Sequence, residues 1–228
     1  MRAIFMKSLL LITLTVFCLT TDSQTLRQEL LRQDSTLKDV TIIKCNVDPN
    51  LFITILVREK DWWEDLQVVN FSNGHIQWVA SFDTVPSSQS IYTARQISLK
   101  GIAFPLIEVF DVTHQGNGYY YLYELKGKHA KLITQTRAVD WNFDGGLEYN
   151  HKYCSIIYKN GTLTPTYKDM NNDGYTDIIL KGTIQIYDDD WKTMLKQYPA
   201  QKVLYYNKSK NKFVEDLKRR KGFKMDDD

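Results

Sequence analysis

The chain has 228 residues, of which 43% are hydrophobic, and its 29 Lys and Arg residues nearly balance its 27 Asp and Glu residues. This balance argues against a partner recognised by charge alone, such as a nucleic acid or an anionic membrane. The length and apolar content suffice for one sizeable core. Since no long Pro-, Gly- or Ser-rich linker interrupts the chain, the sequence predicts a single all-β domain over residues 24–217 and a charged C-terminal tail over 218–228.

The first 23 residues have the pattern of a secretory signal peptide. Arg2 and Lys7 supply the positive start, and the apolar run that follows is too short for a membrane span. We therefore expect the mature protein to be secreted or periplasmic, with no membrane span of its own. Cys18 leaves a lipoprotein as an alternative, which the bulky Phe17 before it disfavours.

Two cysteines, Cys45 and Cys154, remain in the predicted mature chain. In an oxidising compartment, two cysteines placed on strands can pair in a disulfide. The alternative is a pair of buried thiols. The sequence has no other Cys or suitably spaced His beside them, so it does not predict a zinc site.

A short helix is expected at the start of the mature chain, and hairpins after it. Leu26, Leu30 and Leu31 have helical spacing between residues 24 and 39. The rest alternates segments rich in Tyr, Ile, Val and Thr with turn pairs such as Asn73-Gly74 and Asn160-Gly161. The predicted strands cover residues 40–47, 51–58, 66–71, 75–81, 91–100, 104–112, 119–125, 130–136, 153–158, 162–167, 177–181, 183–187, 202–206 and 212–215. This pattern predicts an antiparallel all-β fold.

Two acidic loops, residues 140–148 and 169–177, share the pattern D-x-N-x-D-G-x-x-(D/E). Oxygens at the first, third and fifth positions point to one centre, glycine at the sixth allows a sharp turn, and the seventh carbonyl and ninth carboxylate close the shell. An all-oxygen shell suits Ca²⁺. The predicted ligands are Asp140, Asn142, Asp144, Gly146 (through its carbonyl) and Glu148 in the first loop, and Asp169, Asn171, Asp173, Tyr175 (through its carbonyl) and Asp177 in the second. The alternative is a pair of metal-free polar turns.

These loops are not EF-hands, because their twelfth positions are His151 and Leu180 and strands are expected on both sides. Asp111 opens a degenerate third copy in which Gln115 and Tyr119 replace carboxylates, so we expect this copy to bind no metal. Its distance to the first loop equals the distance between the two acidic loops, which suggests a repeated unit of one loop and one hairpin. We expect the metal to be structural, neutralising carboxylates and joining adjacent hairpins.

The run from 169 to 180, Asp-Met-Asn-Asn-Asp-Gly-Tyr-Thr-Asp-Ile-Ile-Leu, resembles the calcium loops of FG-GAP and VCBS-type repeats, which build integrin-like β-propellers. The first loop resembles them too, and the resemblance covers about residues 137–187. It implies Ca²⁺ on the ligands named above and a propeller-like arrangement of hairpins, with a β-sandwich or a compact barrel-like domain as alternatives. The Phe-Gly and Gly-Ala-Pro elements of the first family are absent. The Asp-x-Asn-Phe-Asp-Gly run at 140–145 is also similar to loops in periplasmic calcium-binding proteins related to lysozyme inhibitors.

The sequence favours an exported, calcium-stabilised binding or structural protein whose exposed loops contact a protein or glycan. Its four histidines are scattered, and it has no nucleophile elbow or phosphate-binding glycine loop, so no catalytic residue or organic cofactor is predicted. Two alternatives stay open: an inhibitor of a cell-wall-degrading enzyme, and a carbohydrate-active hydrolase that uses paired carboxylates.

Overall fold

The computed structural model describes residues 22–59, 64–84, 90–112, 118–139, 147–149, 152–154, 156–158, 164–187 and 193–222. Within these ranges the chain forms an N-terminal helix and then the strands β1 to β16, nearly all paired antiparallel. The predicted all-β fold with a short N-terminal helix is therefore confirmed. No helix in the described ranges has the length and apolar character needed to cross a membrane.

The chain divides into two compact units, one up to Ala80 and one from Ser81. Each unit has its own sheets and its own cluster of buried hydrophobic side chains. The single domain predicted over residues 24–217 stays a prediction. So does the signal peptide, which falls almost wholly on residues outside the described ranges.

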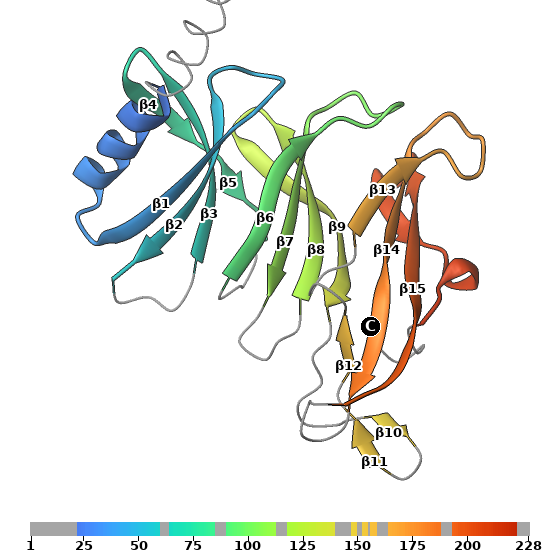
Figure 1. The fold of residues 1–228 in the computed structure, drawn as a ribbon. Helices are drawn as coiled ribbons and strands as arrows, with labels where there is room; N and C mark the ends of the chain where they lie inside the picture. The colour runs from blue at the N-terminus through green and yellow to red at the C-terminus, as the bar shows by residue number, and fades with distance from the viewer. Residues whose placement is uncertain are drawn as a thin grey trace, which may run out of the picture. The chain divides into compact units, whose positions relative to one another are not determined.

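The first unit consists of a helix and a four-stranded antiparallel sheet (Figure 1). Residues 22–33 are helical. The strands follow one another across the sheet in chain order: β1 (Leu37–Lys44), β2 (Leu51–Arg58), β3 (Glu64–Ser72) and β4 (His75–Val79). Between β3 and β4, Asn73 and Gly74 have φ of 54° and 79°, the left-handed conformation that Asn-Gly turns adopt. The predicted hairpin at this turn is confirmed.

The helix is held to the sheet by one apolar face. Leu26 and Leu30 are buried in a cluster with residues of β1, β2 and β3, whereas Leu31 is 38% exposed. The helix ends near Asp34, whose carboxylate accepts the backbone N–H of Thr36 at 3.0 Å and the Nε–H of Arg58 at 2.9 Å. The expected extension of the helix to residue 39 is wrong, because this side-chain turn ends it and β1 begins at Leu37.

The second unit contains two five-stranded sheets and one two-stranded sheet. The first five-stranded sheet has the order β5 (Ser81–Phe82), β9 (His129–Val139), β8 (Gly118–Lys126), β7 (Leu106–Val112) and β6 (Ser90–Ile97). The second contains β12 (Ile156–Tyr158), β13 (Thr164–Lys168), β14 (Asp177–Tyr187), β15 (Met194–Asn207) and β16 (Lys212–Glu215). The two-stranded sheet pairs β10 (Leu147–Tyr149) with β11 (Lys152–Cys154), and a 3-10 helix η2 (Leu217–Arg219) follows β16.

Two predicted hairpins in this unit are wrong. Both β12 and β13 pair antiparallel with β14, so they run in the same direction along one edge and do not form a hairpin about Asn160-Gly161. The segments 177–181 and 183–187 form the single strand β14, because Gly182 stays in the ladder opposite Ala200 of β15. Pairing with β14 in the first place, and the long ladder of β14 with β15 in the second, override the local turn signals.

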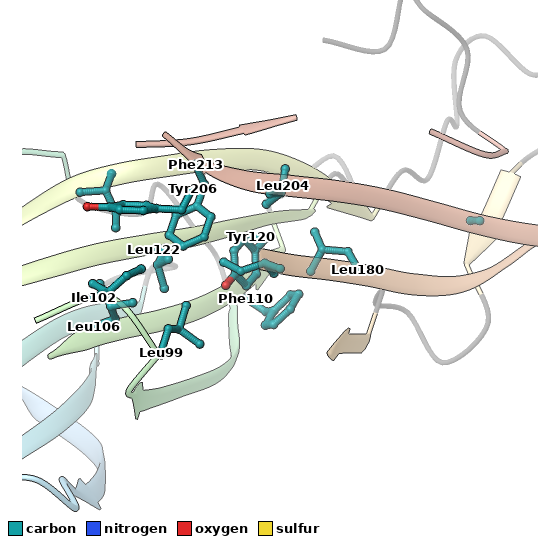
Figure 2. Packing of buried hydrophobic residues seen from close by; sticks show 13 residues of the cluster. Leu99, Ile102, Leu106, Phe110, Tyr120, Leu122, Leu180, Leu204, Tyr206 and Phe213 are labelled. Carbon is teal, nitrogen blue, oxygen red and sulfur yellow. The ribbon is translucent and has the colours of Figure 1, made fainter. Parts of the chain in front are cut away.

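The two five-stranded sheets share one hydrophobic core. Figure 2 shows Tyr120 and Leu122 of β8 directed toward side chains of the other sheet, among them Leu204 of β15 and Phe213 of β16. Tyr120 also meets Phe110 edge to face, with ring centroids 4.9 Å apart. The sheets of the described residues do not show a propeller, which stays a prediction of the family resemblance.

A buried polar network crosses between the same two sheets. The carboxylate of Glu108, 1% exposed, accepts hydrogen bonds from the hydroxyls of Tyr120 and Tyr167 and from Nε of Arg95. Arg95 also donates to the Tyr167 hydroxyl at 2.7 Å. Loss of hydration raises the pKa of Tyr167, and the negative charge of Glu108 adds to this rise. Because Tyr167 lies on β13 and the other members on β6, β7 and β8, the network joins the sheets by charge as well as by packing.

We expect Leu26→Ala to destabilise the first unit by about 2–5 kcal/mol, because it removes a fully buried side chain from between the helix and the sheet. Leu31→Ala, in the same helix but partly exposed, is the control and should cost less than about 1 kcal/mol. Urea denaturation of the purified variants measures both values. Equal losses would show that the buried face of the helix is not what holds it.

Candidate metal centre

The second acidic loop connects two neighbouring strands of one sheet. Lys168 at the end of β13 pairs with Asp177 at the start of β14, so residues 169–176 form the hairpin connection. Strands therefore flank this loop on both sides, as predicted. Asn172 and Gly174 have φ of 61° and 89°, and the turn is left-handed at both. Glycine at the sixth position thus has the conformational role expected of it.

Asp169 is the centre of the turn. Its carboxylate accepts the N–H of Gly174 at 2.9 Å and the N–H of Asp173 at 3.3 Å. Loss of hydration acts to raise its pKa, but these and neighbouring N–H groups together hold the pKa of Asp169 below its usual value. The first predicted ligand is thus stabilised as a carboxylate by the loop backbone.

Asp177 joins the loop to the sheet. Its carboxylate is fully buried and accepts the N–H of Met170 at 2.8 Å and the N–H of Tyr206, on β15, at 3.3 Å. Burial raises the pKa of Asp177, and the negative charges of Asp173 and Asp169 raise it further. The charges of Asp173 and Asp169 therefore act on Asp177 and disfavour its ionised form.

Asn171 and Asp173 bond to each other inside the loop. The Asn171 amide nitrogen donates to the Asp173 carboxylate at 3.0 Å, and the Asp173 N–H donates to the Asn171 amide oxygen at 3.1 Å. The same carboxylate accepts the N–H of Tyr175 at 2.9 Å. Four of the five predicted ligand residues are thus connected by hydrogen bonds that involve their side chains. In this conformation the loop is closed by its own N–H groups.

Among the described residues, no three or more His, Cys, Asp and Glu side chains form a group that could hold a metal ion. Two of the predicted ligands in the second loop, the Asn171 amide oxygen and the Tyr175 carbonyl, are not of these types. The donor set consists of oxygens alone, which matches Ca²⁺ in chemistry, while the carboxylates are turned toward backbone N–H groups.

A second segment packs against this loop. The N–H of Thr176 donates to the carbonyl of Lys100 at 2.9 Å. Gly101 has φ of 86°, and a Cβ there would lie 2.7 Å from Cδ1 of Tyr175 and 2.9 Å from the carbonyl oxygen of Gly174. The Tyr175 ring also lies 5.3 Å from that of Tyr206. This contact was not predicted from the sequence, although a glycine between the buried Leu99 and Ile102 was an available signal.

The first acidic loop lies mostly outside the described residues: Asp140, Asn142, Asp144 and Gly146 are not among them. Glu148 lies on β10 opposite Tyr153. The strands on either side of this loop, β9 and β10, belong to different sheets, unlike those that flank the second loop. The ligand set of the first loop stays a prediction.

The degenerate copy at Asp111 begins within a ladder rather than in a loop. Asp111 on β7 pairs with Tyr119 on β8, and its carboxylate accepts the N–H of Tyr119 at 3.0 Å. Its side chain is buried, and burial raises the pKa of Asp111 to about 6, against the opposing effect of this hydrogen bond. It is therefore a buried acid that keeps its proton to a higher pH than an exposed aspartate does.

Cys45 is a free and buried thiol, and burial raises its pKa to about 11. The side chain of Cys154, on β11, lies outside the described part of the chain. Cys45 is therefore a buried thiol, as in the alternative to a disulfide. A disulfide between Cys45 and Cys154 stays a prediction.

Lys202 is another residue that the sequence analysis missed. Its side chain is fully buried, next to Glu215 and Thr136. The signal was its position in β15, two and four residues before the buried Leu204 and Tyr206, because alternate residues of a strand share a face.

No protein-family model matches the chain, and no curated protein or solved structure is significantly similar to it. The resemblance to FG-GAP and VCBS-type repeats therefore rests on the residues of the two acidic loops alone.

We expect Gly101→Ala to destabilise the second unit more than Gly127→Ala does. Both glycines have positive φ, which costs alanine about 1–2 kcal/mol, but a Cβ on Gly127 meets nothing within 4 Å, whereas one on Gly101 must displace Tyr175 or the Gly174 carbonyl. Thermal unfolding of both variants isolates the contact with the loop. An equal loss of stability in the two variants would mean that the loop moves away from residue 101 without a cost in free energy.

Asp111 should make stability fall as pH rises. The folded state keeps its proton up to about pH 6, whereas the unfolded chain releases it near pH 3.8. The folded state therefore binds more protons in this window, and the free energy of unfolding decreases through it by on the order of 2 kcal/mol. Urea denaturation across the window should show that Asp111→Asn removes this decrease.

Asp83→Asn is the matched control for Asp111→Asn, because the exposed carboxylate of Asp83 also accepts a backbone N–H, that of Leu132 at 2.8 Å. If the free energy of unfolding of Asp111→Asn differs from that of the wild type by the same amount at every pH in the window, the role assigned to burial is contradicted.

Proposed function

We propose that the protein is an exported, calcium-stabilised β-rich binding or structural protein, in which the loop 169–177 holds Ca²⁺. The observation that carries this proposal is the state of Asp177, the last predicted ligand of the loop. Its carboxylate is fully buried, and its pKa is raised first by burial and then by the charges of Asp173 and Asp169.

The electrostatics of the loop favour a cation. Buried or crowded carboxylates repel each other, and a divalent ion among them removes that repulsion. The hydrogen bonds that Asp169 and Asp177 accept from N–H groups do not prevent metal binding. Each carboxylate oxygen has two lone pairs, so it can accept an N–H and bind a metal ion at the same time. Hard oxygen donors select Ca²⁺ or Mg²⁺ over zinc, and Ca²⁺ accepts a less regular arrangement of oxygens than Mg²⁺ does.

A bound ion would act structurally. Asp177 is bonded to the Tyr206 N–H of β15, and Thr176 is bonded to the carbonyl of Lys100, so the loop is in contact with two other segments of its unit. Calcium would fix these contacts together and make the surface loops a rigid platform for a protein or glycan partner.

Export and a second calcium site are parts of the same proposal. Export is supported by the signal-like pattern of the first 23 residues, and a second site in the loop 140–148 is supported by its matching ligand sequence. Neither the inhibitor nor the hydrolase alternative is favoured by a specific contact among the described residues.

Calcium should raise the thermal unfolding temperature of the chelator-treated protein, and Asp173→Ala should reduce that rise. At a calcium concentration of about 100 times Kd, one site adds about 2.7 kcal/mol to the free energy of unfolding. The measurement is a calcium titration followed by differential scanning calorimetry. Part of the rise should remain in the variant if the first loop also binds.

Asp48→Ala is the matched control for Asp173→Ala. Asp48 accepts the N–H of Asn50 at 2.9 Å, as Asp173 accepts that of Tyr175, so both substitutions remove the same kind of side-chain turn. The control should keep the full calcium response. An unfolding temperature indifferent to calcium and chelator, or an equal reduction in both variants, would refute the metal site.

A further inference from the structure

Lysines gather in the second unit where the tips of two hairpins meet. The turn between β8 and β9 follows Lys126, and the turn between β15 and β16 follows Asn207. The side-chain amide of Asn211, in the second turn, donates to the carboxylate of Glu124, near the end of β8, at 2.7 Å. The two tips are therefore neighbours. The lysines at or next to them are called the basic patch: Lys126, Lys128, Lys131, Lys208, Lys210 and Lys212.

The members of the basic patch are arranged around the hydrogen bond between Asn211 and Glu124. Both chain neighbours of Asn211 are lysines of the patch. Lys131 pairs with Glu124 across the ladder of β8 and β9, and Lys126 lies two residues beyond Glu124, about 7 Å along the strand. Such separations do not exceed the Debye length of about 8–10 Å at ordinary ionic strength. The positive charges of the two tips therefore act together on a charged partner.

The lysines of the basic patch are all exposed, and none of them forms an ion pair within the described part of the chain. Two acids lie beside the tips. Glu124 is 7% exposed and bonded to Asn211, while the carboxylate of Asp83 accepts the N–H of Leu132 on β9 at 2.8 Å. The patch therefore presents more positive charge than these two acids balance, and it favours an anionic partner although the whole chain is nearly neutral.

The candidate metal loop adjoins the basic patch at Lys208. The Nζ of Lys208 lies 5.6 Å from the centroid of the Tyr175 ring. This lysine therefore also faces the acidic loop 169–177, and it is kept unchanged in the test below.

The composition of the two tips favours one class of polyanion. They read Lys-Gly-Lys-His-Ala-Lys at 126–131 and Asn-Lys-Ser-Lys-Asn-Lys at 207–212. They have no Arg, whose planar fork suits phosphate, no Phe, Tyr or Trp on which nucleic-acid bases stack, and no large apolar side chain to enter a membrane. The hydroxyl of Ser209 donates to Asn207 Oδ1 at 2.8 Å, and its oxygen can still accept a hydrogen bond from a sugar hydroxyl. Lysines among small polar residues suit a carboxylated sugar chain.

We propose that the basic patch binds a linear acidic polysaccharide through the carboxylate groups of its sugars. This inference rests on the binding role in the proposed function and names the class of partner. It does not rest on the calcium site, so a failure of either one leaves the other standing.

The probe is a short oligogalacturonate, and its fully methyl-esterified form is the matched neutral comparison. Each is titrated into the purified protein by isothermal titration calorimetry. A chelator is present, so that calcium does not bridge the sugar carboxylates to the loop 169–177. The acid form should bind with saturation, and more weakly as salt is added, because the charges of the patch are exposed and therefore screened. The ester should not bind.

A triple variant tests the patch itself: Lys126→Gln, Lys210→Gln and Lys212→Gln together. It should weaken the binding of oligogalacturonate by about tenfold, because each exposed charge contact contributes modestly and three are removed. Far-UV circular dichroism verifies that the variant is folded. If it is not, Lys126→Gln alone should weaken binding by about twofold.

The control variant removes the same charge from exposed positions outside the patch, Lys38→Gln, Lys181→Gln and Lys218→Gln, and should keep the full affinity. The proposal is overturned if oligogalacturonate shows no saturable binding up to about 1 mM, or if its ester binds as well. It is also overturned if the control variant loses as much affinity as the patch variant, or if a DNA duplex or phosphatidylserine vesicles bind the protein more tightly than oligogalacturonate does.

Discussion

The second unit depends on one constraint: two five-stranded sheets bury a common apolar core, and the polar groups at the boundary of that core must find partners inside the protein. Glu108 meets this requirement by bonding to tyrosines on β8 and β13, and Asp177 by accepting N–H groups from its own loop and from β15. Lys202 meets it beside Glu215 and Thr136. Because an unpaired buried charge is far more costly than a paired one, these contacts fix how the two sheets lie on each other.

Local signals in the sequence predict the type of element well and the pairing of elements less well. The Asn73-Gly74 hairpin follows from the positive φ that this pair tolerates, and Leu26 and Leu30 predict the buried face of the helix. By contrast, Asn160-Gly161 has the same local signal, yet β12 and β13 pair with β14 instead of with each other. The hydrogen bonds of a sheet join strands that are distant in the sequence. A single turn pair therefore does not decide which strands pair.

In the candidate metal loop, too, the sequence predicts local contacts better than contacts between distant segments. The pattern D-x-N-x-D-G-x-x-D predicts the sharp turn at Gly174 and, in the alternative of a polar turn, the side-chain hydrogen bonds inside the loop, since both are local properties. It does not predict that Gly101 comes within van der Waals distance of Tyr175, or that Asp177 is bonded to the N–H of Tyr206. These contacts depend on segments far away in the chain, and they are what a bound ion would stabilise.

The candidate metal loop is joined to the shared core through the strand β15. Asp177 accepts the N–H of Tyr206 on this strand, and Leu204 and Lys202, two and four residues earlier, are buried. Alternate residues of a strand are on one face, so the side chains of Lys202, Leu204 and Tyr206 lie on the same side of β15. Because Asp177 and Lys202 are both buried, water screens their charges less than it would at the surface. An ion bound in the loop would therefore act on the core through the position of β15 as well as through its charge.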